Sequence, residues 1–144
     1  MTNIVRSDVI EAVKSAVESV VDWREVRLEV PNFAKISSFP SIYIYAGGIN
    51  RIFQESSRRY FQFPVNILIF SSSESNDMID AQTNADGLLT MVIDAVDQSA
   101  DLHSVSVLAV INEEIKSGML NGHREKYVQH LKYRVRIERK RLTP

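Results

Sequence analysis

The sequence predicts an α+β domain with a mixed, mainly antiparallel β-sheet and two main helices packed on one face of that sheet. Three observations lead to this fold class. Apolar residues recur at helical spacing in two separate segments, and other apolar segments alternate with the period of a strand. The expected strands also come in adjacent pairs on either side of the second helix, which favours antiparallel neighbours. The predicted order is α-β-β-β-α-β-β, in a single domain that spans residues 1–144.

The first predicted helix covers Val9–Val20. Ser7 can cap its amino-terminal end, and Asp8 lies in the first turn, where a negative charge is favoured. An apolar stripe on one face and polar residues on the other indicate a helix that covers a core. The stripe consists of Val9, Val13, Ala16, Val17 and Val20.

Two short strands are expected next. Val26–Val30 alternates apolar and charged residues, and Pro31 ends it because proline cannot donate to a ladder. A loop follows over residues 33–40. The β-branched and aromatic run Ser41–Tyr45 is then a second strand, which Gly47–Gly48 interrupts.

A long strand is predicted over Arg58–Phe70, after the polar segment Ile49–Ser57, which is typical of a hairpin tip or a mobile loop. The odd-numbered residues of the long strand from Phe61 to Ile69 form an apolar face. The opposite face becomes apolar toward Phe70, which predicts that this end is covered on both sides. Pro64 favours an edge position or a bulge, because it cannot donate to a ladder.

The second helix is predicted over Asp77–Val96, with an apolar stripe that begins with two alanines. A strand over Ser104–Ile111, a polar turning segment over Asn112–Gly122 and a long alternating strand over Tyr127–Arg139 follow. Two strand pairs are expected: Ser41–Tyr45 with Arg58–Phe70, and Ser104–Ile111 with Tyr127–Arg139.

The composition excludes several kinds of site. There is no cysteine, which excludes disulfides, thiolate metal sites and cysteine nucleophiles, and which fits a cytosolic protein. Charged residues interrupt the first apolar segment, so we expect no signal peptide. The most apolar strip, Val65–Phe70, is too short to cross a membrane. We therefore expect no membrane partner.

The charge is unevenly distributed along the chain, although the net charge is only −1 and suggests no general affinity for nucleic acid. Residues 71–101 hold seven acids and no Lys or Arg, whereas residues 123–144 hold eight bases and two acids. Such polarity can steer association with other molecules. The alternative interpretation is two solvated faces that are salt-bridged within one monomer.

The sequence contains no recognised motif for catalysis or metal binding. We expect its three histidines to be surface or junction residues rather than ligands. Asp77 and Asp80, together with Asp86, could hold a hard cation. Acids are favoured in the first turn of a helix by its dipole alone, and we prefer that interpretation. We therefore predict a protein that is not an enzyme and that needs no cofactor. The histidines are His103, His123 and His130.

Two groups of basic residues are candidates for an interface with another subunit or a partner. One group could form a basic hairpin, in which Arg58 and Arg59 point to opposite faces. The other group shares one face of the last strand and could meet acids of the next subunit. The candidate interface residues are Arg51, Arg58, Arg59, Lys132, Arg134, Arg136, Asp77 and Asp80.

The layout of the chain resembles the tail terminator (tail completion) proteins of long-tailed bacteriophages over nearly its whole length. The resemblance rests on the order and kind of elements, and not on a short motif. A short amphipathic helix, an aromatic strand with a polar loop, a long apolar strand, an acid-started helix and a long basic strand follow one another. These segments are Val9–Val20, Pro40–Tyr45, Phe61–Phe70, Ala81–Val96 and Tyr127–Arg139.

The resemblance implies a structural virion protein that forms a hexameric ring on the last ring of the tail tube. Such a ring ends tube polymerisation and presents a surface to the head-tail connector or neck protein. In contractile tails the sheath protein is a further implied partner, and DNA only passes through the lumen. The implied location is the virion tail or neck, with assembly in the host cytoplasm. The family has no motif that transfers functional residues to individual positions of this sequence.

Three other interpretations stay open at the level of the sequence. A neck or head-closure protein of the same particle has a similar layout. A small metal-dependent enzyme would use Asp77, Asp80 and Asp86. A host-encoded interaction domain with no phage role is the third.

Overall fold

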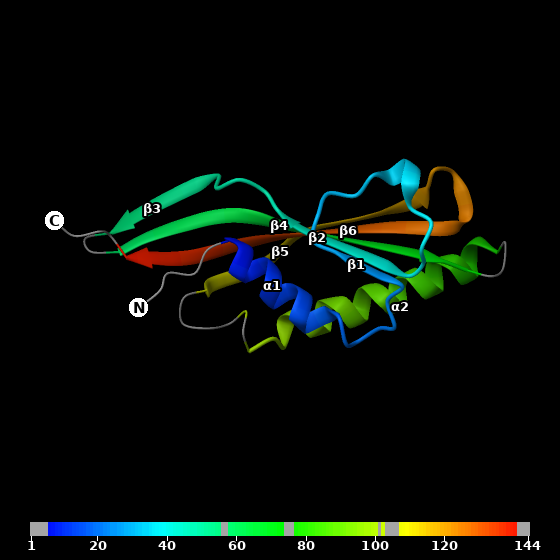
Figure 1. The fold of residues 1–144 in the computed structure, drawn as a ribbon, viewed down its shortest axis with the longest axis horizontal. Coiled ribbons are helices and arrows are strands. Elements are labelled where there is room, and N and C mark those ends of the chain that lie inside the picture. The colour runs from blue at the N-terminus through cyan, green and yellow to red at the C-terminus, as the bar shows by residue number, and fades with distance from the viewer. Residues whose placement is uncertain (1–5, 56–57, 74–76, 101, 103–106, 141–144) are drawn as a thin grey trace.

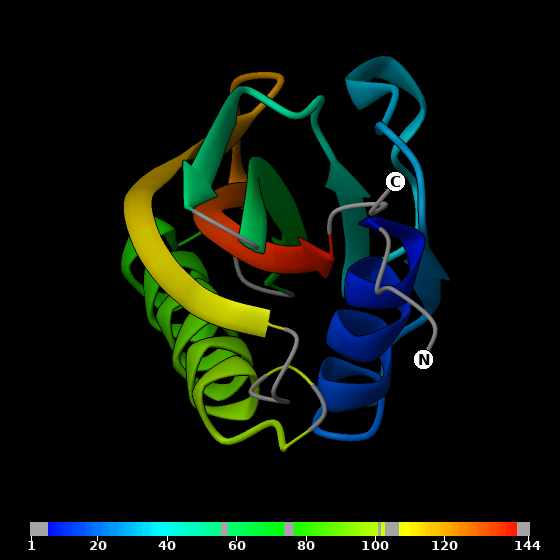
Figure 2. The ribbon, with the colours of Figure 1, turned by 90° about the vertical axis from the view of Figure 1, so that its left-hand side faces the viewer.

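The computed structural model describes residues 6–55, 58–73, 77–100, 102 and 107–140. In this part of the chain, a six-stranded sheet lies over two α-helices, which pack side by side on the same face (Figures 1 and 2). The predicted fold class is confirmed. The elements are α1 (Arg6–Val17), β1 (Glu25–Arg27), the 3₁₀-helix η1 (Phe33–Lys35), β2 (Ser41–Ala46), β3 (Arg51–Glu55), β4 (Arg58–Ser72), α2 (Met78–Asp97), β5 (Val107–Leu120) and β6 (His123–Lys140).

The sheet is built around β4 and β6, which pair antiparallel along the whole of β4. The strand order is β1-β2-β4-β6-β5, and β3 pairs with β4 beyond the end of β2. Only β1 and β2 are parallel to each other; all other pairs described are antiparallel. Both predicted strand pairs, β2 with β4 and β5 with β6, are therefore confirmed. The ends of β3, β4 and β6 extend beyond the helices as an arm (Figure 1).

The main core lies between the sheet and the two helices. The predicted apolar faces of β4 and β6 both point into it, where Phe63, Ile67 and Leu131 have no exposed surface. The stripes of α1 and α2 cover these side chains, as their helical spacing requires. Val is a weak helix former, so packing holds α1 in place more than propensity does. The helical core residues are Val9, Ile10, Val13 and Val17 of α1 and Leu88, Val92 and Val96 of α2.

A second, smaller core covers one end of the opposite face of the sheet. Phe70 lies there in edge-to-face contact with Phe33 of η1 and with Tyr43 of β2, at centroid distances of 5.7 and 5.5 Å. Asn121 in the β5–β6 turn donates a hydrogen bond to the carbonyl of Phe33, which fixes η1 over this end. The prediction that the Phe70 end of the long strand is covered on both sides is confirmed.

Two segments that the sequence predicts as loop or turn are largely strand. The segment Ile49–Ser57 contains β3, whose Ile52 and Phe53 lie opposite Phe61 and Tyr60 of β4. Such cross-strand apolar and aromatic pairs stabilise a strand that is too short to show a periodic pattern.

The segment Asn112–Gly122 is also mostly strand, because β5 continues to Leu120. The turn itself is Asn121–Gly122, both with positive φ (52° and 78°), which suits asparagine and glycine in a two-residue hairpin. The polar side chains of this segment are compatible with a strand, because β5 lies at the edge of the sheet and leaves them in solvent. Residues 104–106 of the predicted strand Ser104–Ile111 lie outside the described residues.

The prediction that Pro64 lies at an edge or a bulge is corrected by the structure. Pro64 lies in the central strand β4, where it is opposite Arg134 of β6 without a register shift. Its place is where the neighbour of β4 changes from β2 to β3. On that side the Pro64 carbonyl accepts a hydrogen bond from Gly47 N (2.9 Å), so the missing N–H faces the loop between β2 and β3. A proline is tolerated here because no strand needs its N–H.

Candidate assembly surface

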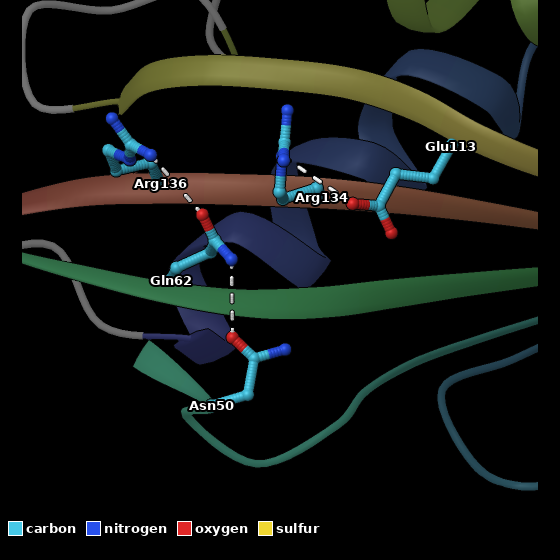
Figure 3. Close-up of polar contacts among 5 residues, drawn as sticks. All are labelled: Asn50, Gln62, Glu113, Arg134 and Arg136. Carbon is cyan, nitrogen blue, oxygen red and sulfur yellow. Dashed lines mark hydrogen bonds and ion pairs between the residues drawn. The ribbon is translucent and has the colours of Figure 1, made fainter. Parts of the chain in front are cut away.

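The face of the sheet that points away from the helices is named here the outer face. It takes alternate residues of each strand, and five of the eight predicted interface residues lie on it. Figure 3 shows part of it, with side chains from the β3 side, β4, β5 and β6. The five residues are Arg51, Arg58, Lys132, Arg134 and Arg136.

An aromatic ring joins two of these arginines on the arm. The guanidinium carbons of Arg51 and Arg136 lie 4.4 and 4.1 Å from the centroid of the Phe53 ring. Each contact of this kind stabilises by about 0.5–1 kcal/mol at an exposed site. Among the side chains that the structure describes, no carboxylate forms an ion pair with either arginine. Their positive charges are therefore held over the Phe53 ring without a carboxylate partner among the described side chains.

A short polar chain fixes Arg136 from the other side. Arg136 Nη2 donates to Gln62 Oε1 at 3.3 Å, and Gln62 Nε2 donates to Asn50 Oδ1 at 3.4 Å (Figure 3). Both acceptors are neutral amides, so the guanidinium is held in one direction without losing its charge.

The other outer-face arginines have acidic partners within the chain. Arg134 Nε lies 3.5 Å from Glu113 Oε1 of β5, and Arg58 Nε lies 3.6 Å from Glu138 Oε1 of β6. Exposed pairs of this type contribute about 0–1 kcal/mol each. The interpretation that the basic face is salt-bridged within one monomer therefore holds for Arg134 and Arg58, whereas Arg51 and Arg136 form no ion pair with a described side chain.

Lys132 lies beside a histidine in the middle of the outer face. His130 Nε2 donates to Asn66 Oδ1 at 2.8 Å, since the amide oxygen can only accept. Burial lowers the pKa of His130, and the nearby charges of Lys116 and Lys132 lower it further against the opposing effect of Glu114. The neutral imidazole is therefore the form that the fold favours.

Because the pKa of His130 is lower in the fold than in the unfolded chain, stability is present above the ordinary histidine pKa and falls as the pH drops below it. We expect urea midpoints of the protein to decrease between pH 7.5 and pH 5.5. His130→Gln keeps a donor toward Asn66 and cannot titrate, so its midpoint should change less over this range. Equal pH slopes for both proteins would show that His130 does not contribute.

Arg59 does not belong to the outer face. It follows Arg58 in β4, and alternation places it on the side of Phe61 and the helices, as predicted. Its Nε atom is buried with no hydrogen-bond partner among the described residues.

Asp77 and Asp80 lie in the other layer of the molecule, at the start of α2. Asp77 is the N-cap, and its carboxylate accepts a hydrogen bond from Ile79 N at 2.9 Å. Asp80 lies in the first turn, and Asp86 accepts from Gln129 Nε2 at 3.3 Å. Within the described residues, no group of three or more His, Asp or Glu side chains is placed to hold a metal ion. The sequence predicts Asp77 in the first turn of the helix, and the structure places it one residue earlier, as the N-cap.

Sequence reasoning missed Phe53, Gln62, Asn50 and Glu113. Phe53 follows Arg51 by two residues, which is a usable signal only once β3 is known to be a strand. Glu113 lies at a register shift in β5, between Asn112 and Glu114, and alternation alone gives no prediction of its face.

An open depression of about 550 Å³ lies between α1 and β2. Among the described residues that line it, Glu11 is the one carboxylate and there is no histidine. Its lining consists of Arg6, Ser7, Ile10, Glu11, Leu28, Tyr45 and Ala46. In the part of the chain that the structure describes, no helix has the length and apolarity to cross a bilayer.

The fold is similar to that of chains in two solved structures. No protein-family model and no curated protein sequence matches this chain. A chain of the virion of a native gene transfer agent particle is similar in structure, with TM-score 0.52 and 12% identity over 94% of this chain and 95% of that chain. So is a chain in an extracellular contractile injection system, described as the PVC sheath/tube terminator in extended state. That match has TM-score 0.57 and 17% identity over 99% of this chain and 59% of the other. At these identities the likeness concerns the fold, and it agrees with the resemblance found in the sequence.

Proposed function

We propose that this chain is a tail terminator of a phage-like particle, a structural subunit that closes the end of a tail tube. One observation supports this most: the fold matches a chain in a sheath/tube terminator structure over 99% of this chain. An assembly role also fits a chain whose described residues form no group of three or more His, Asp or Glu side chains placed to hold a metal ion. No cofactor is proposed.

The proposed assembly is a hexameric ring on the last ring of the tube, in which each copy contacts the next head to tail. Such packing requires two unlike surfaces on one subunit. The basic outer face and the acidic start of α2 lie in different layers and differ in charge. We propose that outer-face bases meet Asp77 and Asp80 of a neighbour, with apolar contacts contributing most of the free energy.

The double charge reversal Arg134→Glu and Arg136→Glu is expected to weaken the ring. Losing attraction and adding repulsion at two sites should raise the dissociation constant about tenfold, since tenfold corresponds to about 1.4 kcal/mol. Sedimentation at several protein and salt concentrations measures this change. Arg27→Glu is the control, because Arg27 lies on β1 and pairs with Glu25 of its own chain. An oligomer unchanged by the double reversal would remove these residues from the interface.

The functional test is tube length. Particles that lack this chain should form tubes of uncontrolled length without heads attached, and adding the purified protein should cap preformed tubes. Electron microscopy of tubes measures both effects, and six-fold rings with a central hole should appear on tube ends. Tubes of normal length in its absence would contradict the proposal.

A neck or head-closure protein is the main alternative, since the gene transfer agent match names a particle and not a component. Co-sedimentation with purified tubes and, separately, with connectors separates the two roles. Binding to the tube supports a terminator, and binding to the connector alone supports a neck protein.

We further propose the virion tail or neck as the location, assembly in the host cytoplasm, a sheath contact where a sheath exists, and a lumen through which DNA passes.

A metal-dependent enzyme and a host-encoded interaction domain would be rejected by different measurements. Titration calorimetry with Mg²⁺ or Mn²⁺ is expected to show no heat, because Asp77 is used as a helix cap. Genes for tail proteins next to this one would exclude a host role.

A further inference from the structure

We infer that the free edge of β5 pairs with β3 of the next copy, so that the sheets of neighbouring subunits join into one antiparallel sheet. This inference rests on the proposed ring and names the segments that would hold it together. It concerns backbone pairing, and it is an alternative to the contacts with Asp77 and Asp80 proposed above, because a continuous sheet places the outer faces of all copies on one side and their helices on the other.

The edge of β5 is long and open. The strand covers Val107–Leu120, compared with about 5–6 residues for a usual strand, and among the described residues it pairs with β6 alone. All residues from Ile111 to Ser117 are exposed. An edge of this kind presents unpaired N–H and C=O groups that another strand can bind.

The protection of this edge is incomplete. Three register shifts interrupt β5, and bulges of this type hinder the docking of a further strand. No shift occurs between Glu114 and Met119, so these residues form a regular run. Ile115 and Met119 on this run are each 46% exposed. Exposed apolar residues are unusual on an edge strand that must not pair with another chain.

The opposite side of the sheet offers a second free edge. Among the described residues β3 pairs only with β4, and Ile52 on it is 59% exposed. The strands β3, β4, β6 and β5 alternate in direction. Rotation about a ring axis preserves the direction of each strand relative to that axis. The β5 of one copy and the β3 of the next therefore run antiparallel, as the rest of the sheet does.

The side chains of the two edges match on the side of the helices. On the side of the helices, Ile115 lies opposite Leu131 of β6, and Ile52 lies opposite Phe61 of β4, so both edges show an isoleucine there. On the outer side, β5 has Glu113 near Glu114, and β3 has Arg51 without an ion-pair partner among the described side chains. In the antiparallel register that sets Ile52 opposite Ile115, the two isoleucines meet on the side of the helices. On the outer side, Arg51 then lies opposite Lys116 and diagonal to Glu114.

A second copy is the occupant that these features favour. Both edges belong to one chain, lie on opposite sides of one sheet and differ from each other, which is what a head-to-tail contact between copies requires. β3 and the regular run of β5 lie at different heights along the sheet. Their pairing shifts each copy along the strands, and closed sheets require such a stagger.

Cysteine cross-linking tests this pairing directly, because the chain has no cysteine of its own. The variant Ile52→Cys is combined in turn with Ile111→Cys, Glu113→Cys, Ile115→Cys and Ser117→Cys. Each double variant is assembled into rings, treated with a short bis-maleimide and separated on a denaturing gel. We expect at least one combination to give a ladder of cross-linked species up to the size of the ring. Each single variant should stay monomeric on the gel, because the two edges differ.

Three other outcomes would overturn the inference, and they can be told apart. Dimers from Ile115→Cys alone would show that two β5 edges pair with each other. Visible rings without a ladder in any combination would reject the β5–β3 contact and leave the terminator proposal standing. The absence of rings, in solution and on tube ends, would reject both. Circular dichroism of each variant excludes misfolding. Because the cysteine is placed at four different exposed positions of β5, the result does not depend on any single substitution.

Discussion

Phe70→Ala is expected to lower the free energy of unfolding by about 3–5 kcal/mol, the usual range for removing a buried phenylalanine. Phe70 has no exposed surface and contacts Phe33 and Tyr43 edge to face. The loss should also free η1 from the outer face, because its ring contact disappears. Urea unfolding followed by circular dichroism measures the first effect, and faster amide exchange around Phe33 reports the second.

Phe70→Leu is the matched control. It keeps most of the apolar volume and removes only the aromatic contacts, so its cost should stay near or below about 1.5 kcal/mol. If Phe70→Ala and Phe70→Leu destabilise equally, packing volume is not what holds this smaller core together. An unchanged exchange rate at Phe33 would show that η1 is held by the Asn121 hydrogen bond instead.

Gly47→Ala is expected to destabilise the fold by about 1–3 kcal/mol, the usual cost of overpacking. A Cβ at Gly47 would lie 2.6 Å from Pro64 Cγ and 3.2 Å from Pro64 Cδ, so the ring or the loop must move. Gly48→Ala is a control one residue away, because a Cβ there meets nothing within 4 Å. That change should be close to neutral, since it mainly restricts the unfolded chain. Urea midpoints of the two variants give the comparison.

A double-mutant cycle shows whether Pro64 is the cause. Pro64→Ala removes the Cγ and Cδ atoms that a new side chain at Gly47 would meet. The cost of Gly47→Ala should therefore be smaller in the Pro64→Ala background, with a coupling of about 0.5–3 kcal/mol. Additive costs would place the strain elsewhere in the loop.

The parts of the fold with a strong period could be predicted from the sequence. The stripes of both helices and the alternation of β4 and β6 place Val13, Val92, Ile67 and Leu131 in the main core, as found. These patterns are dictated by burial on one side of an element, which the residue order records directly.

The elements at the edges of the sheet could not be predicted in the same way. β3 has too few residues to show a period. Its stability comes from pairing with β4, and the local residue pattern of β3 does not reveal that partner. The polar half of β5 has solvent on its free side, so its residues do not alternate between buried apolar and exposed polar positions. Pro64 was misplaced for a related reason, because its position depends on where β2 ends and β3 begins.

The candidate surface was only partly predictable. Alternation correctly assigns Lys132, Arg134 and Arg136 to one face, and separates Arg58 from Arg59. It gives no indication of which bases are neutralised, because the partners Glu113, Glu138 and Phe53 come from three different strands. The difference between Arg134, which contacts the carboxylate of Glu113, and Arg136, which contacts Gln62 and Phe53, appears only after the strands are aligned.

The long β4–β6 ribbon has a mechanical consequence. β4 and β6 pair without a register shift from Arg58 opposite Lys140 to Ser72 opposite Lys126, which spans about 50 Å at the usual rise per residue. A load that pulls these two strands lengthwise in opposite directions acts on all their hydrogen bonds at once, because antiparallel bonds lie perpendicular to the strands. A load that peels the arm away from one end breaks the bonds one after another. The ribbon therefore resists a lengthwise load better than a load that peels the arm.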